Sequence, residues 1–401
     1  MHHGILKTAA LTVAFCVFGS ALAADWPKFR GPNADGISPE TGIRKDWKEN
    51  PPNVLHKVAM GDGGYAGPAV ADGRIFIIDH QGADDVVRAI DTETGENVWT
   101  FKYADAPQNN YGFARSTPTV DGDRIYTLSR LGVLHCLSID GEKVWEVNIT
   151  NTFGGKHPKW QMAMSPVIDG DKVIVVPGGP DAAVAALDKT TGKTIWKGGN
   201  SDRPGYATPV VATIDGTKQY VIFTAFKLMG VDAEDGKVLW EFPWRTAHDV
   251  NAATPIVSGD EIFITSNYNR GCALVRIKGG KAEAVWENKS MASHFSTPVL
   301  SDGYIYGSTT TGNLACIKWE TGEVAWKVPG FERGGVVAVD GALIAVDGSS
   351  GEVVMFELKP DEGIELGRIK PLGGQSWTGP IVADGKLIVR NKAELAWIKL
   401  K

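Results

Sequence analysis

One repeated unit, which recurs every 40 to 51 residues, constrains the fold of this chain more than any other feature. Each unit has a small residue or Thr followed by Pro, then Asp-Gly between two apolar runs, then Asp-x-x-Thr-Gly-Lys-x-x-Trp. The repeat prolines are Pro68, Pro118, Pro166, Pro209, Pro255, Pro298 and Pro380. The closing tryptophans are Trp99, Trp145, Trp196, Trp240, Trp286 and Trp326. A repeat of this period, rich in strand and turn residues, is typical of a propeller blade.

The composition of each unit favours four antiparallel strands. Asp-Gly suits a two-residue hairpin because Gly tolerates positive φ, and it occurs at 72-73, 121-122, 302-303 and 384-385. The runs RIFIID, RIYTLS and EIFITS have the β-branched and aromatic residues of strands. A second tight turn, as in DKTTGKTIW, leads into an outer strand. We expect its Trp to pack between neighbouring blades while the indole N–H finds an acceptor.

The number of units predicts an all-β, eight-bladed propeller that is closed by strand exchange between the two ends of the chain. Six units are complete, and a degenerate seventh from about Gly334 to Lys370 keeps Asp-Gly but lacks the Pro and the Trp. The eighth supplies only three strands. The missing strand is available at Asn53 to Met60, and its pairing with the last blade would remove two open sheet edges. Seven blades is the alternative.

The first 23 residues have the pattern of a signal peptide. Lys7 supplies the positive charge, the apolar run 11–18 is too short to span a bilayer, and small residues flank Leu22. We expect cleavage after Ala23 and a periplasmic or secreted protein. Bulky Phe15 precedes Cys16, which argues against attachment of a lipid there.

Residues 24–52 lie outside the repeat, and we expect an irregular strap across a single propeller domain of residues 53–401. The chain has 41 basic and 47 acidic residues, a net charge of −6, and no stripe of Lys or Arg. Nucleic acid and anionic membrane surfaces are therefore poor partners. No later segment is long enough to span a membrane, and we expect a monomer.

The three cysteines beyond the signal peptide are predicted to be buried free thiols. These residues are Cys136, Cys272 and Cys316, and an odd number cannot all pair with one another. They also lie in apolar, strand-like runs, so they do not indicate a disulfide scaffold. No phosphate loop, HExxH, CxxC or GxSxG motif is present. We therefore assign no catalytic residue and no metal ligand.

The segments RAIDTETGENVW and AALDKTTGKTIW resemble the PQQ-type propeller repeat, and the resemblance covers about residues 53–401. One branch of such proteins, the quinoprotein dehydrogenases, implies pyrroloquinoline quinone with Ca²⁺ over the centre of the propeller. The other includes BamB, a non-catalytic subunit of the machinery that inserts β-barrels into the outer membrane. Length and export favour the BamB-like branch. The chain lacks the adjacent cysteine pair of the first branch and the lipid-bearing cysteine of the second.

The repeat also predicts which residues surround one mouth of the central channel. The position three residues before each repeat Pro opens the innermost strand, and it holds Tyr65, Arg115, Ala163, Tyr206, Ala252, Phe295 and Trp377, with Arg333 in the degenerate unit. The preceding loops add His157, Trp160, Arg203, His248, Asn251 and His294. Large residues at this mouth are interpreted either as a plug of the channel or as a site for a planar anion or a peptide.

Three functions remain open from the sequence. The first is an exported scaffold that binds envelope proteins such as outer-membrane assembly components. The second is a quinoprotein oxidoreductase that acts on alcohols or sugars with PQQ and Ca²⁺. The third is an extracellular propeller that recognises carbohydrate through the aromatic residues of the mouth. We favour the scaffold, because no catalytic constellation is recognisable.

Overall fold

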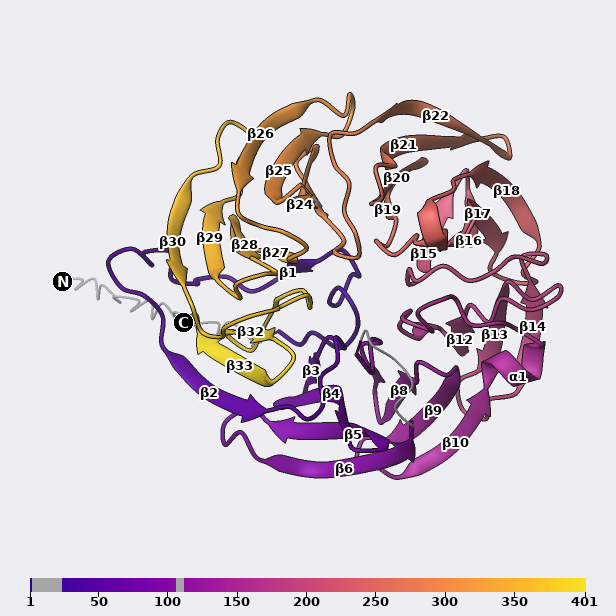
Figure 1. Cartoon of the computed structure of the whole chain (residues 1–401), viewed down its shortest axis with the longest axis horizontal. Coiled ribbons are helices and arrows are strands. Elements are labelled where there is room, and N and C mark those ends of the chain that lie inside the picture. Colours follow the sequence, from indigo (N-terminus) through magenta and orange to yellow (C-terminus); the bar gives the residue numbers. More distant parts are fainter. Residues whose placement is uncertain (2–23, 106–111, 310) are drawn as a thin grey trace.

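In the computed structural model the strands form eight antiparallel sheets that are arranged as blades around a central axis (Figure 1). The structure describes residues 1, 24–105, 112–309 and 311–401. Except for Met1, the predicted signal peptide lies outside the described residues. No helix in the described part of the chain is long and apolar enough to cross a bilayer.

Each blade is built outward from a short innermost strand. Blade 1 has β3 (Ala69–Ala71), β4 (Arg74–Gln81), β5 (Asp84–Asp91) and β6 (Asn97–Ala104). Blade 2 has β7 (Thr119–Asp121), β8 (Arg124–Leu128), β9 (Val133–Ser138) and β10 (Lys143–Asn148). Blade 3 has β11 (Val167–Asp169), β12 (Lys172–Val175), β13 (Val184–Asp188) and β14 (Thr194–Gly198). Blade 4 has β15 (Val210–Ile214), β16 (Thr217–Phe223), β17 (Lys227–Asp232) and β18 (Val238–Pro243).

The second half of the ring continues in the same way. Blade 5 has β19 (Ile256–Ser258), β20 (Glu261–Ser266), β21 (Gly271–Lys278) and β22 (Lys281–Asn288). Blade 6 has β23 (Val299–Ser301), β24 (Tyr304–Thr309), β25 (Asn313–Lys318) and β26 (Val324–Pro329). Blade 7 has β27 (Val336–Val339), β28 (Ala342–Val346), β29 (Val353–Glu357) and β30 (Glu365–Ile369). Blade 8 has β31 (Ile381–Ala383), β32 (Lys386–Arg390) and β33 (Glu394–Lys399), with β2 (Val54–Ala59) outermost.

Three short elements lie outside this pattern. They are β1 (Ile37–Ser38), which adds to blade 7, the helix α1 (Ile149–Phe153) and the 3-10 turn η1 (Ala247–Asp249). The eight blades confirm the predicted fold and exclude seven. The degenerate seventh unit forms a complete blade because its strands β27 and β28 are wholly buried apolar residues, which supply the packing that its missing Pro and Trp do not.

The ring is closed by the predicted exchange between the chain ends. Strand β2 pairs antiparallel with β33, with Val58 opposite Leu395. Figure 1 shows β2 along the outside of the C-terminal blade. Trp397 of β33 then donates its indole N–H to the carbonyl oxygen of Thr92 in blade 1 at 2.9 Å. The junction between first and last blades therefore has both a β-ladder and a buried indole contact.

Neighbouring blades are held together by an indole that lies on a glycine. Trp99 of blade 1 covers Gly141 of blade 2, where φ is 88° and an added Cβ would lie 2.5 Å from the indole. The same arrangement recurs with Trp145 on Gly192 and Trp286 on Gly322. This glycine ends the tight turn before each outer strand, as Gly192 does in the Asp-x-x-Thr-Gly of residues 188–192. Glycine is therefore required at this position for two reasons: the backbone has a positive φ, and the indole of the preceding blade leaves no room for a Cβ.

Most of these indoles also donate a hydrogen bond to the next blade, as predicted. Trp99 donates to Ile139 O at 3.0 Å, and Trp145, Trp286 and Trp326 make the same bond. Trp240 instead donates to Gln219 Oε1 within its own blade at 2.6 Å. In blade 5, which follows Trp240, the last two strands are joined by a two-residue hairpin, with Lys278 opposite Lys281. This hairpin lacks the longer turn whose carbonyl oxygen accepts from the indole in other blades. The Nε1 atom of Trp196 has no recorded partner.

A belt of hydroxyl groups links the innermost strands on the channel side. The amide of Thr117 donates to Ser165 Oγ at 2.9 Å, and the amide of Ser165 donates to Thr208 Oγ1 at 3.0 Å. The series continues to Thr254 and Thr297 at 3.3 and 2.9 Å. Each of these residues directly precedes a repeat Pro. The recurring Ser/Thr-Pro pair is thus the sequence mark of an inter-blade hydrogen bond.

Three of the four hairpins predicted at Asp-Gly have these two residues in the turn, and the fourth does not. At 72-73 both residues occupy the turn, with φ of 49° and 69°. At 121-122 the prediction was wrong by one residue, because Asp121 pairs with Arg124 and the turn consists of Gly122 and Asp123. Gly122 therefore takes the first turn position, where φ is 58°.

The outer strands carry a β-bulge directly before the repeat Trp. Val98 and Val144 occupy the bulged positions, and their side chains are 47% and 43% exposed. The bulge breaks the regular row of backbone donors and acceptors on an outer edge. It thereby makes each edge a poor template for pairing with another chain.

The three cysteines of the described chain are free and buried, which confirms that prediction. Burial raises the pKa of Cys136 to about 11 and the pKa values of Cys272 and Cys316 to about 12. These thiols are therefore protonated at neutral pH and act as small apolar core residues.

Replacing Gly141 should destabilise the fold more than replacing another glycine of positive φ that has no neighbour. Gly141→Ala places a methyl group against Trp99, so we expect a loss of about 3 kcal/mol in the free energy of unfolding. Gly122→Ala is the control, because φ is also positive but nothing lies within 4 Å. It should cost about 1 kcal/mol. Urea unfolding of both variants measures the difference, and equal losses would contradict the indole-on-glycine contact.

Candidate functional site

The segment of residues 26–38 closes one end of the central channel. Trp26 forms a two-way bridge with Val70 of blade 1, and the amide of Val120 in blade 2 donates to Pro27 O at 2.8 Å. Further along, Arg30 donates to Pro298 O of blade 6 at 2.9 Å. Strand β1 pairs with β27 of blade 7, and Ser38 Oγ donates to Val382 O of blade 8. This segment, here called the floor, is therefore fixed to five blades.

A cavity of about 440 Å³ lies between the floor and the mouth of the channel. The predicted site residues that line it are Tyr65, Arg115, Trp160, Ala163, Tyr206, Ala252, His294, Phe295, Arg333 and Trp377. Residues of the floor that were not predicted also line it, namely Trp26, Phe29 and Arg30. They lie in the segment WPKFRGPN. Its two aromatic residues, within an otherwise polar stretch, were the only sign in the sequence that this segment could be buried against the propeller. Tyr268, from the β20–β21 loop, was missed as well.

The other four predicted residues do not line the cavity. Asn251 is fully buried and donates to Thr224 O at 2.8 Å, so it fixes the loop rather than faces the channel. Arg203 points outward and pairs with Asp249 at 2.7 Å. His248 makes an edge-to-face ring contact with Trp160. His157 is exposed, and partial desolvation lowers its pKa. The repeat places these residues in the correct loops, but it does not fix the direction of their side chains.

The mouth is surrounded by aromatic rings in mutual contact, here called the aromatic collar. Successive ring centroids lie 4.9 to 6.3 Å apart. In order, the rings belong to Tyr206, Trp160, His248, Tyr268, His294, Phe295, Trp377 and Tyr65. Tyr65 and Trp377 are stacked, whereas the contacts of Tyr268 are edge-on. The collar supplies apolar ring faces around the opening.

The cavity is cationic. Three arginines and one histidine line it, and no Asp or Glu is found among its described lining residues. Burial lowers the pKa of Arg30 to about 10, and its guanidinium donates to backbone carbonyls of the floor and of blade 6. Burial, and then the nearby Arg130, lower the pKa of Arg115. Burial and Arg333 lower the pKa of His294 to about 4, so this imidazole is neutral at pH 7.

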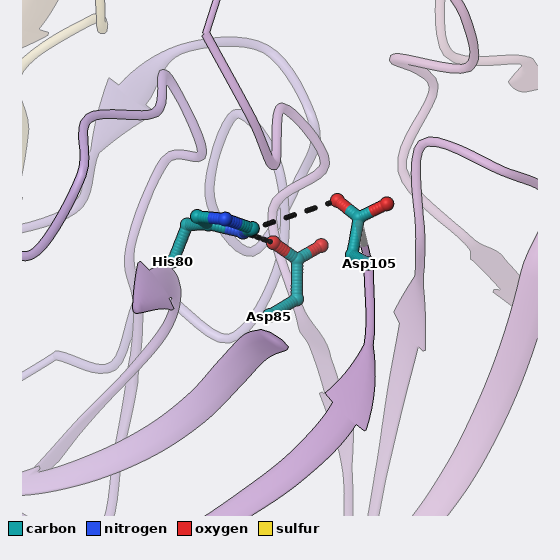
Figure 2. Close-up of side chains that lie close together, drawn as sticks. All are labelled: His80, Asp85 and Asp105. Carbon is teal, nitrogen blue, oxygen red and sulfur yellow. Dashed lines mark hydrogen bonds and ion pairs between the residues drawn. The ribbon is translucent and has the colours of Figure 1, made fainter. Parts of the chain in front are cut away.

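Beside the cavity, a buried polar cluster joins blades 1 and 2. His80 Nδ1 lies 2.8 Å from Asp85 Oδ1 and 4.0 Å from Asp105 Oδ2 (Figure 2). Tyr103 donates to Asp85 at 3.2 Å, and Arg130 Nε donates to Asp105 at 2.5 Å. The ring of His80 stacks on Phe113 of the segment that carries Arg115 into the cavity. The cluster therefore supports one wall of the cavity.

The geometry of this cluster fits a shared proton better than a metal ion. His80 Nε2 lies 3.0 Å from Gly82 O, which only accepts, so Nε2 carries a proton. The contact of Nδ1 with the Asp85 carboxyl then needs a second proton between the two groups. One ligand atom from each of His80, Asp85 and Asp105 lies within 4.8 Å of the others. The guanidinium of Arg130 already supplies a positive charge to Asp105, which disfavours a cation there.

Comparison with known proteins identifies one family. The family model described as outer membrane protein assembly factor BamB matches residues 83–328. The chain is similar to the BamB protein of Yersinia pestis, at 22% identity over 346 residues, which cover 82% of this chain and 73% of that protein. It is also similar to the BamB protein of Escherichia coli strain K12, at 24% identity over 334 residues, covering 79% and 83%.

Solved structures with the same fold come from more than one kind of protein. BamB from Moraxella catarrhalis superposes with a TM-score of 0.65 at 18% identity, covering 87% of this chain and 98% of that chain. Quinohemoprotein alcohol dehydrogenase from Comamonas testosteroni has the same TM-score at 13% identity, covering 93% and 80%. At these identities the superpositions show the fold alone.

The cavity does not fit the Ca²⁺ that the quinoprotein resemblance implies. Calcium is held by six to eight oxygen ligands, mainly carboxylates, carbonyls and amide side chains. The described lining residues include no Asp, Glu, Asn or Gln, and they bring three guanidinium groups instead. The buried cysteines 136, 272 and 316 lie in blades 2, 5 and 6, so no pair of them is adjacent.

The buried cluster predicts how stability depends on pH. Burial, and then the charge of Asp105, raise the pKa of Asp85 to about 7. The folded state therefore holds a proton that the unfolded state releases above about pH 4, and the free energy of unfolding should fall as pH rises from about 4 to about 7. In Asp85→Asn this slope should be much smaller. Urea unfolding across that range measures it.

The matched control for this experiment is Asp302→Asn, which changes an exposed turn residue of the same type. Its pH dependence should follow that of the wild type. If Asp85→Asn also keeps the wild-type slope, then Asp85 is ionised in the folded state and the raised pKa assigned to it is wrong.

Proposed function

This chain belongs to the family of the outer membrane protein assembly factor BamB, and we propose on that basis that it is a non-catalytic scaffold that binds partner proteins in the cell envelope. The family match over residues 83–328, which covers most of blades 1 to 6, is the observation that carries the proposal. The predicted signal peptide would place the chain in the periplasm. The partners would be components of outer-membrane protein assembly, which the names of the relatives state for those proteins.

A groove beside the mouth is the surface that we propose for a partner. It has a volume of about 430 Å³ and is lined by Gly154, Lys156, Gly178, Gly179, Pro180, Ser201, Asp202, Arg203, Phe226, Lys227 and Arg245, here called the cationic groove. Arg203 and Arg245 both lie over the ring of Phe226, at 4.9 and 4.4 Å. Lys156 and Arg245 have no recorded carboxylate partner in the described chain. An acidic segment of a partner would complement this charge.

Reversing one charge in the groove should weaken the function without disturbing the fold. We expect Arg245→Glu to reduce cross-linking of the exported chain to its envelope partner about tenfold or more, because it places a like charge against an acidic segment. Lys281→Glu, on the exposed β21–β22 hairpin, is the matched control and should cross-link as the wild type does.

The same variants test the role in outer-membrane assembly. Cells that lack the chain should contain less outer-membrane protein, and wild type and Lys281→Glu should restore the level. Full restoration by Arg245→Glu would exclude the groove as the partner surface. Normal outer-membrane protein in cells without the chain would count against the scaffold itself.

The quinoprotein alternative has its own test. Because the cavity lacks oxygen ligands for Ca²⁺, we expect no saturable change in absorbance when the purified chain is mixed with PQQ and Ca²⁺. We also expect no reduction of a dye by alcohols or sugars in that mixture. Saturable binding at micromolar quinone together with dye reduction would contradict the scaffold proposal and show that the protein is an oxidoreductase.

A further inference from the structure

The cavity presents hydrogen-bond donors that the chain itself does not use. Arg333 Nε and His294 Nδ1 are both buried and make no hydrogen bond. The nearest carboxylate to Arg333 is Glu332, whose oxygen lies 3.4 Å from Nε in a geometry that is not a hydrogen bond. Both residues line the cavity. The Nε atom itself has almost no accessible surface, but the Arg333 side chain is 35% exposed, and its two terminal nitrogens have no hydrogen bond within the described chain, so the guanidinium can still donate to a ligand in the cavity.

The wall of the cavity adds hydroxyl groups with free donor capacity. Thr208, Thr254 and Thr297 accept the amide hydrogen bonds of the belt through their hydroxyl oxygens. No acceptor is recorded in the described chain for the hydroxyl protons of these three residues, which all line the cavity. Each hydroxyl can therefore still donate one hydrogen bond. A ligand with several oxygen atoms would satisfy them.

The shape of the cavity excludes an extended peptide. The floor lies across the channel, bonded to blades 1, 2, 6, 7 and 8, and the cavity volume of about 440 Å³ suits a small molecule rather than an extended chain. At the mouth, the aromatic collar offers ring faces on which the apolar face of a saccharide ring can pack. Arg333 lies over Trp377 at 5.4 Å, so a cation and a ring face are presented side by side.

We propose that the central cavity binds a small acidic saccharide of the hexuronate class. Its carboxylate would pair with Arg333, its ring would pack on the collar at Trp377, and its hydroxyl groups would accept from the threonines of the belt. The cationic lining selects the carboxylate over a neutral sugar. The hydroxyl-rich wall selects a saccharide over a planar aromatic anion. This site is separate from the cationic groove, and its test does not depend on a protein partner.

The test compares ligands that differ in one group. Isothermal titration of the mature chain with D-galacturonate and with D-galactose compares the same ring with and without a carboxylate. We expect galacturonate to bind about tenfold more tightly or better. Naphthalene-2-carboxylate, a planar anion without hydroxyl groups, should bind more weakly than galacturonate. Equal affinity for galactose, tighter binding of the naphthoate, or no binding of galacturonate would each overturn the proposal.

A variant pair locates the site. Arg333→Gln should weaken galacturonate binding about tenfold and leave the affinity for galactose nearly unchanged, because only the carboxylate loses its partner. Arg245→Gln removes a cation of the cationic groove and should change neither affinity. Thermal melting of both variants reports folding. If Arg333→Gln fails to fold, the comparison of ligands on the wild type still tests whether the cavity binds a hexuronate. An unchanged galacturonate affinity in a folded Arg333→Gln variant would reject the assigned site.

Discussion

The contact between an indole and the glycine of the next blade sets the geometry on which the rest of the molecule depends. Trp99 can approach Gly141 closely only because that residue has no Cβ, and its ring then fixes both the distance and the angle to the next sheet. Repetition of this contact turns a linear array of sheets into a circle. The circle in turn brings residues as distant in sequence as Tyr65 and Trp377 into one mouth.

The floor changes what the ring encloses. An eight-bladed propeller alone surrounds a channel that is open at both ends, whereas residues 26–38 convert it into a cavity with one opening. The floor crosses blades 7, 8 and 1, where glycines replace the hydroxyl residues of the belt, at positions 335, 379 and 67. An added Cβ would lie 2.5 Å from Thr117 Oγ1 at Gly67 and 2.4 Å from Gly379 Cα at Gly335, so these two glycines allow neighbouring blades to approach closely. Arg30 fastens the floor to blade 6.

The sequence predicted the repeat, the eight blades and the closing strand, because each depends on residues that recur at a fixed spacing. It also predicted the cavity residues at the start of the innermost strands, such as Arg115 and Phe295, since the position relative to Pro fixes them. It could not place Asn251, whose side chain turns into the core to satisfy backbone carbonyls. It led us to expect a strap at residues 24–52, but it could not predict that Phe29 and Arg30 line the cavity, because these residues belong to no repeat.

The position of the floor also determines the order in which this molecule can be completed. Strands β1 and β2 are synthesised early, yet their partner strands lie in blades 7 and 8, at the far end of the chain, whereas Trp26 and Pro27 contact blades 1 and 2. Middle blades contact only their neighbours and can form as they appear. Strands β1 and β2 therefore stay without their partner strands until blades 7 and 8 have been synthesised. The ring therefore closes only after translation of the last blade. Loss of β33 would remove the partner of β2 and separate the N-terminal strand from the C-terminal blade.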